Sequence, residues 1–151
     1  LHDCLAPIAF LVLLIGAGAG FGRALIDAGV SDVLTGLARH WHMPVLLMAW
    51  GLAALVRLAT GSATVAMSTA AALLAPIAQQ TGLVSPEAMV LATGAGSVAF
   101  GPVTDPGFWQ IKEYLGLSMG QTLLTWSVIE TGIALLALAG AGLFQWLALA
   151  A

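Results

Sequence analysis

The sequence is poor in charge. Only 7% of its 151 residues are charged, against about 25% in an average soluble domain. A chain with so few charges cannot cover a globule with solvated side chains, which excludes a soluble single domain. Its hydrophobic fraction of 60% excludes intrinsic disorder. Four Lys and Arg against seven Asp and Glu leave no basic patch, so nucleic acid is not expected as a partner.

Residues that hold metals and cofactors are also scarce. The single cysteine, Cys4, excludes a disulfide framework and a thiolate metal site. The three histidines do not form a pair with metal-ligand spacing, so no metal is expected. The glycine-rich stretches lack the strand context and the lysine of a phosphate loop, so no nucleotide or other cofactor is expected. The remaining possibility is a protein embedded in a lipid membrane.

The two ends suggest a piece of something larger. The chain opens with Leu1-His2-Asp3, with neither an initiator Met nor a signal-peptide pattern, and it closes inside an apolar run. We therefore expect the C-terminal part of a longer membrane protein, with the remaining N-terminal part as its partner.

Long apolar runs predict the membrane-spanning segments. Residues 4–22 contain no charge and are long enough to cross a hydrocarbon core of ~30 Å, so they predict a transmembrane helix. Residues 23–42 mix charges with apolar residues at helical spacing and predict interfacial helices. Residues 119–150 carry one charge, Glu130, and predict the last transmembrane helix.

The stretch 44–79 is too long for one crossing. As a single helix it would extend over about 50 Å, well beyond the bilayer core. Thr60-Gly61-Ser62 supplies a break, which gives two arms at about 44–59 and 63–79. Two short arms around a Gly-Ser tip predict a re-entrant helical hairpin, which membranes tolerate only where protein buries the tip.

The stretch 86–116 predicts a broken transmembrane helix. It opens with Ser85-Pro86-Glu87, a capping residue followed by a first-turn proline. Two prolines and two glycines then fall within 101–107, and no continuous helix survives them. Helices broken at membrane depth indicate the binding sites of secondary transporters. The expected fold class is therefore an all-α polytopic membrane protein with a re-entrant hairpin and a broken helix.

Two segments carry a family resemblance. The first runs from Arg57 to Ala66 as Arg-Leu-Ala-Thr-Gly-Ser-Ala-Thr-Val-Ala, and the second joins Gly94-Ala95-Gly96-Ser97 to Asp105-Pro106-Gly107-Phe108-Trp109. Both resemble signatures of the gluconate permease (GntP-type) family of sugar-acid:proton symporters. Family members are about three times longer, so the chain resembles their C-terminal third.

The resemblance implies a fold and a location. It implies one inverted repeat of an ion-transporter-superfamily fold, in a homodimer that sits in the bacterial inner membrane as a multi-pass protein. One departure stands out: members usually have Ser-His-Val-Asn-Asp, where this chain has Gly101-Pro102-Val103-Thr104-Asp105. The acid is kept, while a histidine and an asparagine are lost, which leaves the usual substrate in question.

Polar residues at the two breaks are the candidate binding residues. At the hairpin tip, Gly61, Ser62 and Thr64 lie where the second arm offers free N–H groups to an anion. Ser62 is equally suited to a simple N-cap. Ser97 and Thr104 offer hydroxyl groups from the other break.

Three charged residues lie in stretches that are expected to be inside the membrane. Arg57 precedes the tip and is expected to neutralise a substrate carboxylate or to hold an acid such as Asp105 or Glu130, unless it only snorkels to the interface. Asp105 is the candidate proton-coupling residue, although it also fits an N-cap for the helix after it. Glu130 is a weaker candidate, because a lone acid in a last helix can simply pair with a neighbouring helix.

These observations favour a transporter over an enzyme, because no nucleophile–base pair is visible. The leading hypothesis is proton-coupled uptake of gluconate or a related small hydroxy-carboxylate. A hydroxy-amino-acid permease for a substrate such as D-serine is the alternative within the family. A membrane scaffold without a transport cycle is the alternative outside it, although a scaffold needs no unwound helices.

Overall fold

The computed structural model describes residues 44–81 and 84–150, together with isolated residues before position 44 (13, 16, 20, 23, 24, 27–29, 33 and 36). The expected transmembrane helix at 4–22 and the expected interfacial helices at 23–42 lie, as segments, outside the described residues. The described part of the chain contains helices and no strand. In chain order these are α3 (Val45–Thr60), α4 (Ala63–Thr81), α5 (Pro86–Ser97), α6 (Pro106–Tyr114), α7 (Met119–Thr122), the π-helical turn η1 (Leu123–Ser127) and α8 (Val128–Ala150).

Helices α3 and α4 form a hairpin that turns at Gly61. This residue adopts a left-handed conformation with φ of 70°, which glycine reaches without strain, and its N–H donates to the carbonyl of Arg57 at 2.8 Å. Ser62 then starts α4, since its Oγ accepts from the N–H of Val65 at 3.3 Å. The reversal is therefore completed within two residues.

Helices α5 and α6 are joined by an unwound connection, residues 98–105. Phe100 and Gly101 both have positive φ, at 72° and 43°, and Pro102 follows them, so the helix cannot continue. Helix α6 begins again at Pro106, where Asp105 Oδ1 accepts from the N–H of Gly107 at 2.8 Å.

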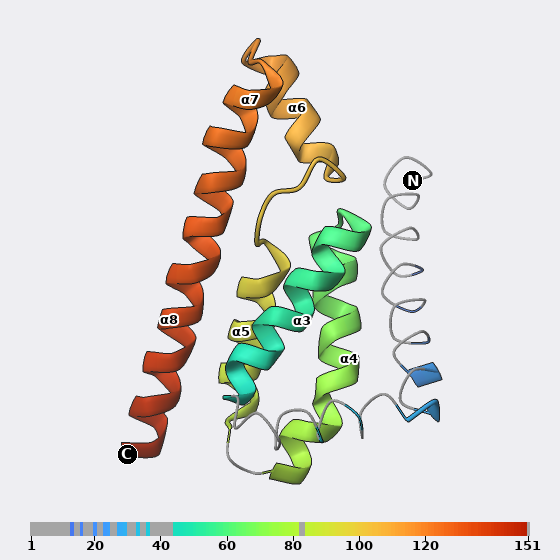
Figure 1. The fold of residues 1–151 in the computed structure, drawn as a ribbon. Coiled ribbons are helices and arrows are strands. Elements are labelled where there is room, and N and C mark those ends of the chain that lie inside the picture. Colours follow the sequence, from blue (N-terminus) through green and yellow to red (C-terminus); the bar gives the residue numbers. More distant parts are fainter. Residues whose placement is uncertain are drawn as a thin grey trace, which may run out of the picture.

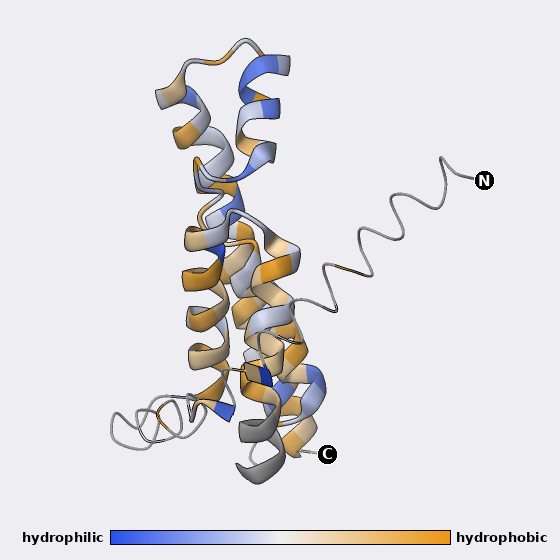
Figure 2. Cartoon of the chain, turned by 90° about the vertical axis from the view of Figure 1, so that its right-hand side faces the viewer, coloured by the Kyte–Doolittle hydropathy of each residue, from blue (hydrophilic) through white to orange (hydrophobic). Residues whose placement is uncertain are grey.

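The last helical run is the longest. Ser118 and Gln121 cap it with reciprocal hydrogen bonds, and helix then continues from Met119 to Ala150 over 32 residues. Within the described residues this is the one helix long and apolar enough to cross a membrane, while Val45–Thr60 and Ala63–Ala75 are shorter apolar helices. Hydrophilic residues gather at the end of the molecule that carries α6, and apolar residues dominate below (Figure 2).

The helices extend to different levels along the helical run 119–150. α5, its connection and α6 follow the helical run 119–150 along its length, whereas the α3–α4 hairpin enters from the lower end and turns level with the first turn of α8, short of α6 and α7 (Figure 1). Both hairpin arms pack against α5, and α5 packs against α8. The core between them consists largely of small residues: Ala49, Ala53, Ala70, Ala92 and Ala141.

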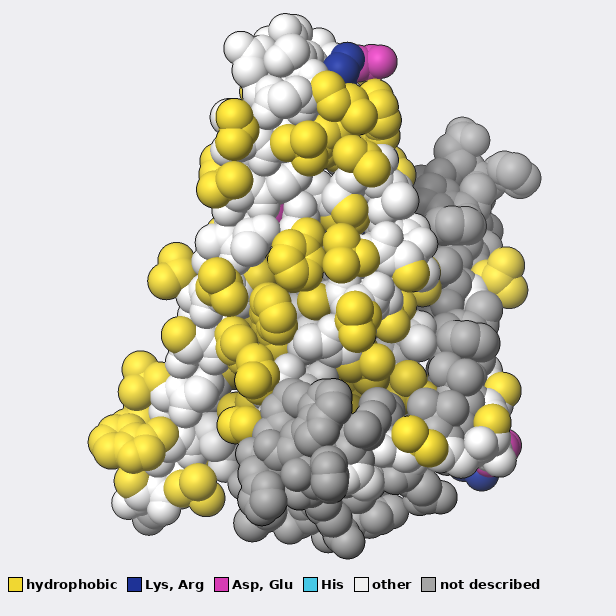
Figure 3. All heavy atoms as spheres, viewed as in Figure 1, with side chains coloured by type: hydrophobic (Ala, Val, Ile, Leu, Met, Phe, Trp, Pro, Cys, Tyr) yellow, Lys and Arg dark blue, Asp and Glu magenta, His cyan; other side chains and the backbone are white. Residues whose placement is uncertain are grey.

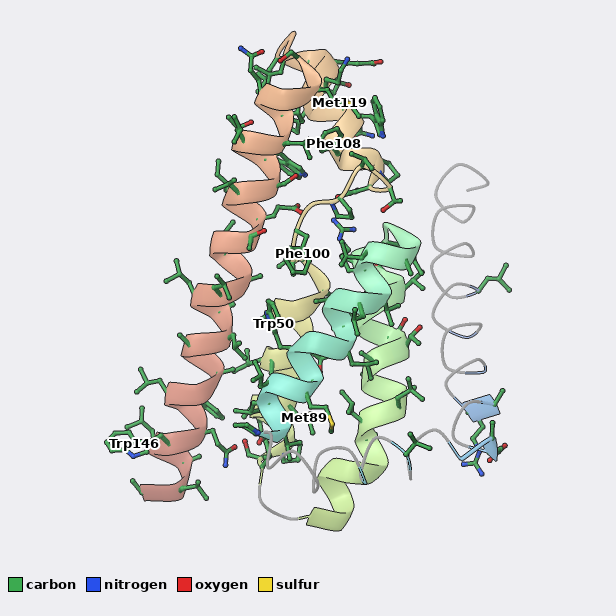
Figure 4. The ribbon with its side chains drawn as sticks, viewed as in Figure 1. Trp50, Met89, Phe100, Phe108, Met119 and Trp146 are labelled. Atoms are coloured by element: carbon green, nitrogen blue, oxygen red, sulfur yellow. The ribbon has the colours of Figure 1, made fainter. Side chains whose placement is uncertain are left out.

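Small residues allow the helices to approach closely. A Cβ added to Gly96 of α5 would lie 2.1 Å from the carbonyl oxygen of Trp50, so α3 crosses α5 backbone to backbone. Trp50 also donates its indole N–H to the carbonyl of Ala134 in α8 at 3.3 Å and meets Phe100 edge to face (Figure 4). These contacts fix the hairpin against the other two helices.

The outer surface is apolar. Large hydrophobic side chains are exposed along η1 and α8, including Leu124, Leu136 and Leu149 at 73–75% exposure. In the space-filling view, hydrophobic side chains cover the middle of the molecule, and the charged ones that are visible lie almost entirely at its upper and lower ends (Figure 3). An all-helical structure with this surface is consistent with a membrane protein.

Candidate functional site

The site is organised around Arg57, in the last turn of α3. Its side chain is 4% exposed although it carries a permanent charge. Nη1 donates to the carbonyl oxygen of Gly61 at 2.6 Å, and Nη2 pairs with Asp105 Oδ2 and with Glu130 Oε2, the latter at 3.5 Å. One guanidinium therefore connects the hairpin tip, the unwound connection and α8.

Asp105 uses both of its carboxylate oxygens. Oδ2 pairs with Arg57, and Oδ1 accepts from the N–H of Gly107 as the N-cap of α6. The N-cap that the sequence offered as the alternative role of Asp105 is present, and so is one of the ion pairs expected for Arg57.

The hairpin tip rests directly on the unwound connection. A Cβ added to Gly61 would lie 2.1 Å from the carbonyl oxygen of Thr104, so only glycine permits this contact. Thr104 Oγ1 in turn donates to the carbonyl of Leu58 at 3.4 Å. Trp109, at the start of α6, donates its indole N–H to the carbonyl of Val103 at 2.8 Å and holds the same connection from its other side.

Glu130 reaches the connection from α8. Its Oε2 lies 2.5 Å from where a Cβ of Gly101 would be, and Trp126 Cδ1 lies 3.0 Å from the same point. Ser127 Oγ donates to the carbonyl of Gly101 at 2.8 Å. Trp126 and Ser127 belong to the π-turn η1, and single π-turns in α-helices are frequent at functional sites.

The structure brings only some of the predicted site residues together. Arg57, Gly61, Thr104 and Asp105 meet in one cluster. Ser62 and Thr64 lie at the start of α4: Ser62 caps the helix, and Thr64 is exposed.

Ser97 differs from the other predicted residues. It is 3% exposed, and its hydroxyl donates to the carbonyl of Gly94 at 2.7 Å, within its own helix. The hydroxyl hydrogen of Ser97 is therefore already engaged in a hydrogen bond within α5.

The side of the site formed by η1 and α8 is poorly marked in the sequence. Glu130 stood out only as a single charge in an apolar helix, and Ser127 and Trp126 gave no signal as members of the site. Their role depends on Gly101, whose closeness to α8 comes from the tertiary structure. No three His, Cys, Asp or Glu residues in the described part of the chain are grouped to hold a metal ion.

Together these features define a class: a helical membrane protein with a buried ion cluster between a hairpin tip and an unwound connection. The sequence pattern of the family described as GntP family permease matches residues 1–147. The chain belongs to the GntP permease family, as its signatures indicated, and is therefore a membrane protein.

Curated relatives agree with this assignment. The chain is 47% identical over 133 residues to a high-affinity gluconate transporter of Escherichia coli, covering 88% of this chain and 30% of the relative. It is 45% identical over 131 residues to a gluconate permease of Pseudomonas aeruginosa, covering 87% and 29%. It is 46% identical over 138 residues to the Gnt-II system L-idonate transporter of Escherichia coli, covering 91% and 31%.

The chain thus spans about 30% of the length of these relatives. They are named as transporters and permeases, which confirms the prediction that the chain is not an enzyme. No solved structure matches it.

Proposed function

We propose that the permease containing this chain takes up gluconate or a related small hydroxy-carboxylate together with protons. The observation that carries this proposal is the buried cluster of Arg57, Asp105 and Glu130 at the meeting point of hairpin tip, connection and α8. Charged residues at membrane depth are costly and typically serve substrate or proton pathways. Relatives named for gluconate and L-idonate support a sugar acid as the substrate.

In this proposal the substrate binds between the two breaks. The N-terminus of α4, with Ser62 and Thr64, offers unpaired N–H groups and a favourable dipole to a carboxylate. Thr104 offers a hydroxyl group from the connection, with Gly61 and Ser97 flanking the site and Arg57 close enough to attract the anion. The proton is carried within the carboxylate pair, of which the sequence singled out Asp105.

The proposed architecture follows the same reasoning. The hairpin, residues 44–79, is re-entrant, and the broken helix, residues 86–116, crosses the membrane beside the transmembrane helix 119–150. These elements form one inverted repeat of a transporter whose other repeat lies in the rest of the permease. Alternating access requires two such halves. The complete protein is proposed to work as a homodimer in the bacterial inner membrane.

The experiment is uptake of labelled gluconate by cells that express the complete permease and lack gluconate uptake of their own. We expect the cells to accumulate labelled gluconate. Unlabelled L-idonate should reduce this uptake by competition, whereas D-serine should not, and a protonophore should abolish it. In a parallel assay with labelled D-serine, uptake of D-serine without uptake of gluconate would assign the hydroxy-amino-acid alternative. Normal insertion in the membrane without uptake of either class would favour the scaffold alternative and contradict the proposal.

A further inference from the structure

We propose that Glu130 on α8 is the group that takes up and releases the coupling proton, while Asp105 remains the ionised counter-ion of Arg57. This inference rests on the proposed function and assigns the proton to one member of the carboxylate pair. The step is simple: a proton from the aqueous side adds to the Glu130 carboxylate to give the neutral acid, and the same proton leaves to the other side.

The first argument is charge balance. Arg57 is always protonated, and it faces two carboxylates, so the fully ionised cluster carries one uncompensated negative charge. A buried charge without compensation is strongly unfavourable. One proton on the pair makes the cluster neutral, and substrate anions approach a neutral cluster more readily than a negative one.

The second argument concerns Asp105, whose oxygens are both engaged as acceptors. Oδ1 caps α6 through the N–H of Gly107, and Oδ2 pairs directly with Arg57. Hydrogen bonds to an ionised acceptor are about twice as strong as those to a neutral one. Protonating Asp105 would weaken both interactions, and with them the start of α6.

The third argument concerns Glu130, which is held more loosely. Its contact with Arg57 is at 3.5 Å, the long limit of a hydrogen bond. Arg57 from α3 and Asp105 from the connection are the charged groups that face it. In the described part of the chain, α4 carries no charge, Glu87 lies at the far end of α5, and Lys112 and Glu113 lie at the end of α6. A proton on Glu130 therefore leaves the cap of α6 and the Arg57–Asp105 pair in place.

The fourth argument links the proton to the site. Glu130 Oε2 lies against Gly101 in the unwound connection, beside the Ser127 hydrogen bond to the same residue. Neutralising Glu130 removes its attraction for Arg57 and so weakens the tie between α8 and the hairpin tip. The charge of Glu130 then influences how the hairpin tip, the connection and α8 pack against one another. Coupling requires such a link, because the proton must change the site at which the substrate binds.

The test compares Glu130→Gln with Asp105→Asn in the complete permease, by concentrative gluconate uptake across pH and by gluconate exchange, which needs no net proton movement. We expect Glu130→Gln to lose pH-driven accumulation by about tenfold or more while exchange stays detectable. Asp105→Asn should lower uptake and exchange together but keep the dependence on pH, because Glu130 still titrates. Glu113→Gln, an exposed acid on α6, is the matched control and should behave like the parent.

Glu130→Asp keeps a carboxyl group and guards against a folding defect in the glutamine variant. It should retain pH-driven accumulation at a reduced rate. Parent-like accumulation by Glu130→Gln, or loss of pH dependence in Asp105→Asn alone, would overturn the inference. A parent permease that accumulates no sugar acid at all would instead contradict the proposed function, so the two failures are distinguishable.

Discussion

At the scale of single residues, Arg57 determines the arrangement of the site. Its planar guanidinium offers several donors in a fixed geometry, which lets it bond the carbonyl of Gly61 and two carboxylates at once. A lysine ammonium is a single point charge on a flexible stem and could not hold all three groups in this geometry. The hairpin tip is therefore held by an ion cluster as much as by apolar packing.

Removing Arg57 should destabilise the permease strongly. Arg57→Met leaves the buried Asp105 and the half-buried Glu130 without a counter-charge, and losing one partner of a buried pair typically costs about 3–5 kcal/mol. The triple variant that also carries Asp105→Asn and Glu130→Gln should recover part of this loss, because no buried charge is then left unpaired. The measurement is unfolding of the purified permease in detergent by heat and by denaturant.

Arg23→Met is the control for that experiment. Arg23 also forms an ion pair, with Asp27 at 3.2 Å, but both side chains are more than half exposed. Exposed pairs contribute little to stability, so this variant should unfold almost like the parent. Equal stability of Arg57→Met and Arg23→Met would show that the buried cluster does not hold the tip.

The sequence identified the charged residues of the site and offered Asp105 or Glu130 as a partner of Arg57, but it did not indicate that both pair with it. Arg57 and Asp105 could be singled out because a charge in an apolar stretch is conspicuous at any position. Their pairing joins residues 48 positions apart, and the contact with Glu130 joins residues 73 apart. No local pattern encodes such distances. Gly101 likewise reads as a helix breaker, and its contact with Glu130 is visible only in three dimensions.

At the scale of elements, local chemistry explains where helices end, and tertiary packing explains the rest. The reversal at Gly61 and the break around Pro102 depend on residues whose backbone preferences are strong, which is why the sequence indicates both. The π-turn has no such signal, because Leu123–Ser127 contains neither glycine nor proline. The π-turn lies where the Ser127 hydroxyl donates a hydrogen bond to Gly101 of the connection, and this contact depends on the tertiary fold.

Two glycines of α5 provide an internal comparison of helix packing. Gly96→Ala should destabilise the permease by about 1–3 kcal/mol, because the new methyl group would collide with the backbone of Trp50 and force α3 away from α5. Gly94→Ala, two residues earlier, meets only the sulfur of Met67 at 3.8 Å and should be neutral or slightly stabilising. Unfolding temperatures of the two variants in detergent test this. If Gly94→Ala proved as damaging as Gly96→Ala, the close crossing of α3 and α5 would be refuted.

At the scale of the whole molecule, the site forms because the α3–α4 hairpin ends short of α6 and α7. The α3–α4 hairpin reaches only the first turn of α8, while α5, the connection and α6 follow the whole helical run 119–150 (Figure 1). The hairpin tip therefore meets the unwound connection inside the structure. Composition and segment lengths were enough to predict a membrane protein with breaks at depth, because lipid tolerates so few alternatives. They could not predict which helix faces each break, since that depends on packing between elements.

A re-entrant hairpin makes a specific prediction about sidedness. Pro44 and Glu87 are exposed residues at the starts of α3 and α5, and Tyr114, at 85% exposure, ends α6 at the other end of the molecule. In the complete permease with all of its cysteines, Cys4 included, replaced by serine, single cysteines at positions 44 and 87 should react with a membrane-impermeant maleimide from the same side. A cysteine at position 114 should react only from the opposite side.

Ala59→Cys distinguishes a re-entrant hairpin from one that crosses completely. Ala59 is exposed in this chain and lies one turn or less from the tip. If the hairpin turns at membrane depth, the bulky maleimide should label position 59 far more slowly than position 114, because the tip lies well short of the surface where α6 ends. A hairpin that crosses the membrane would bring position 59 to that surface. Equal labelling of positions 59 and 114 from one side would therefore refute the re-entrant arrangement, and with it the placement of the Arg57 cluster at membrane depth.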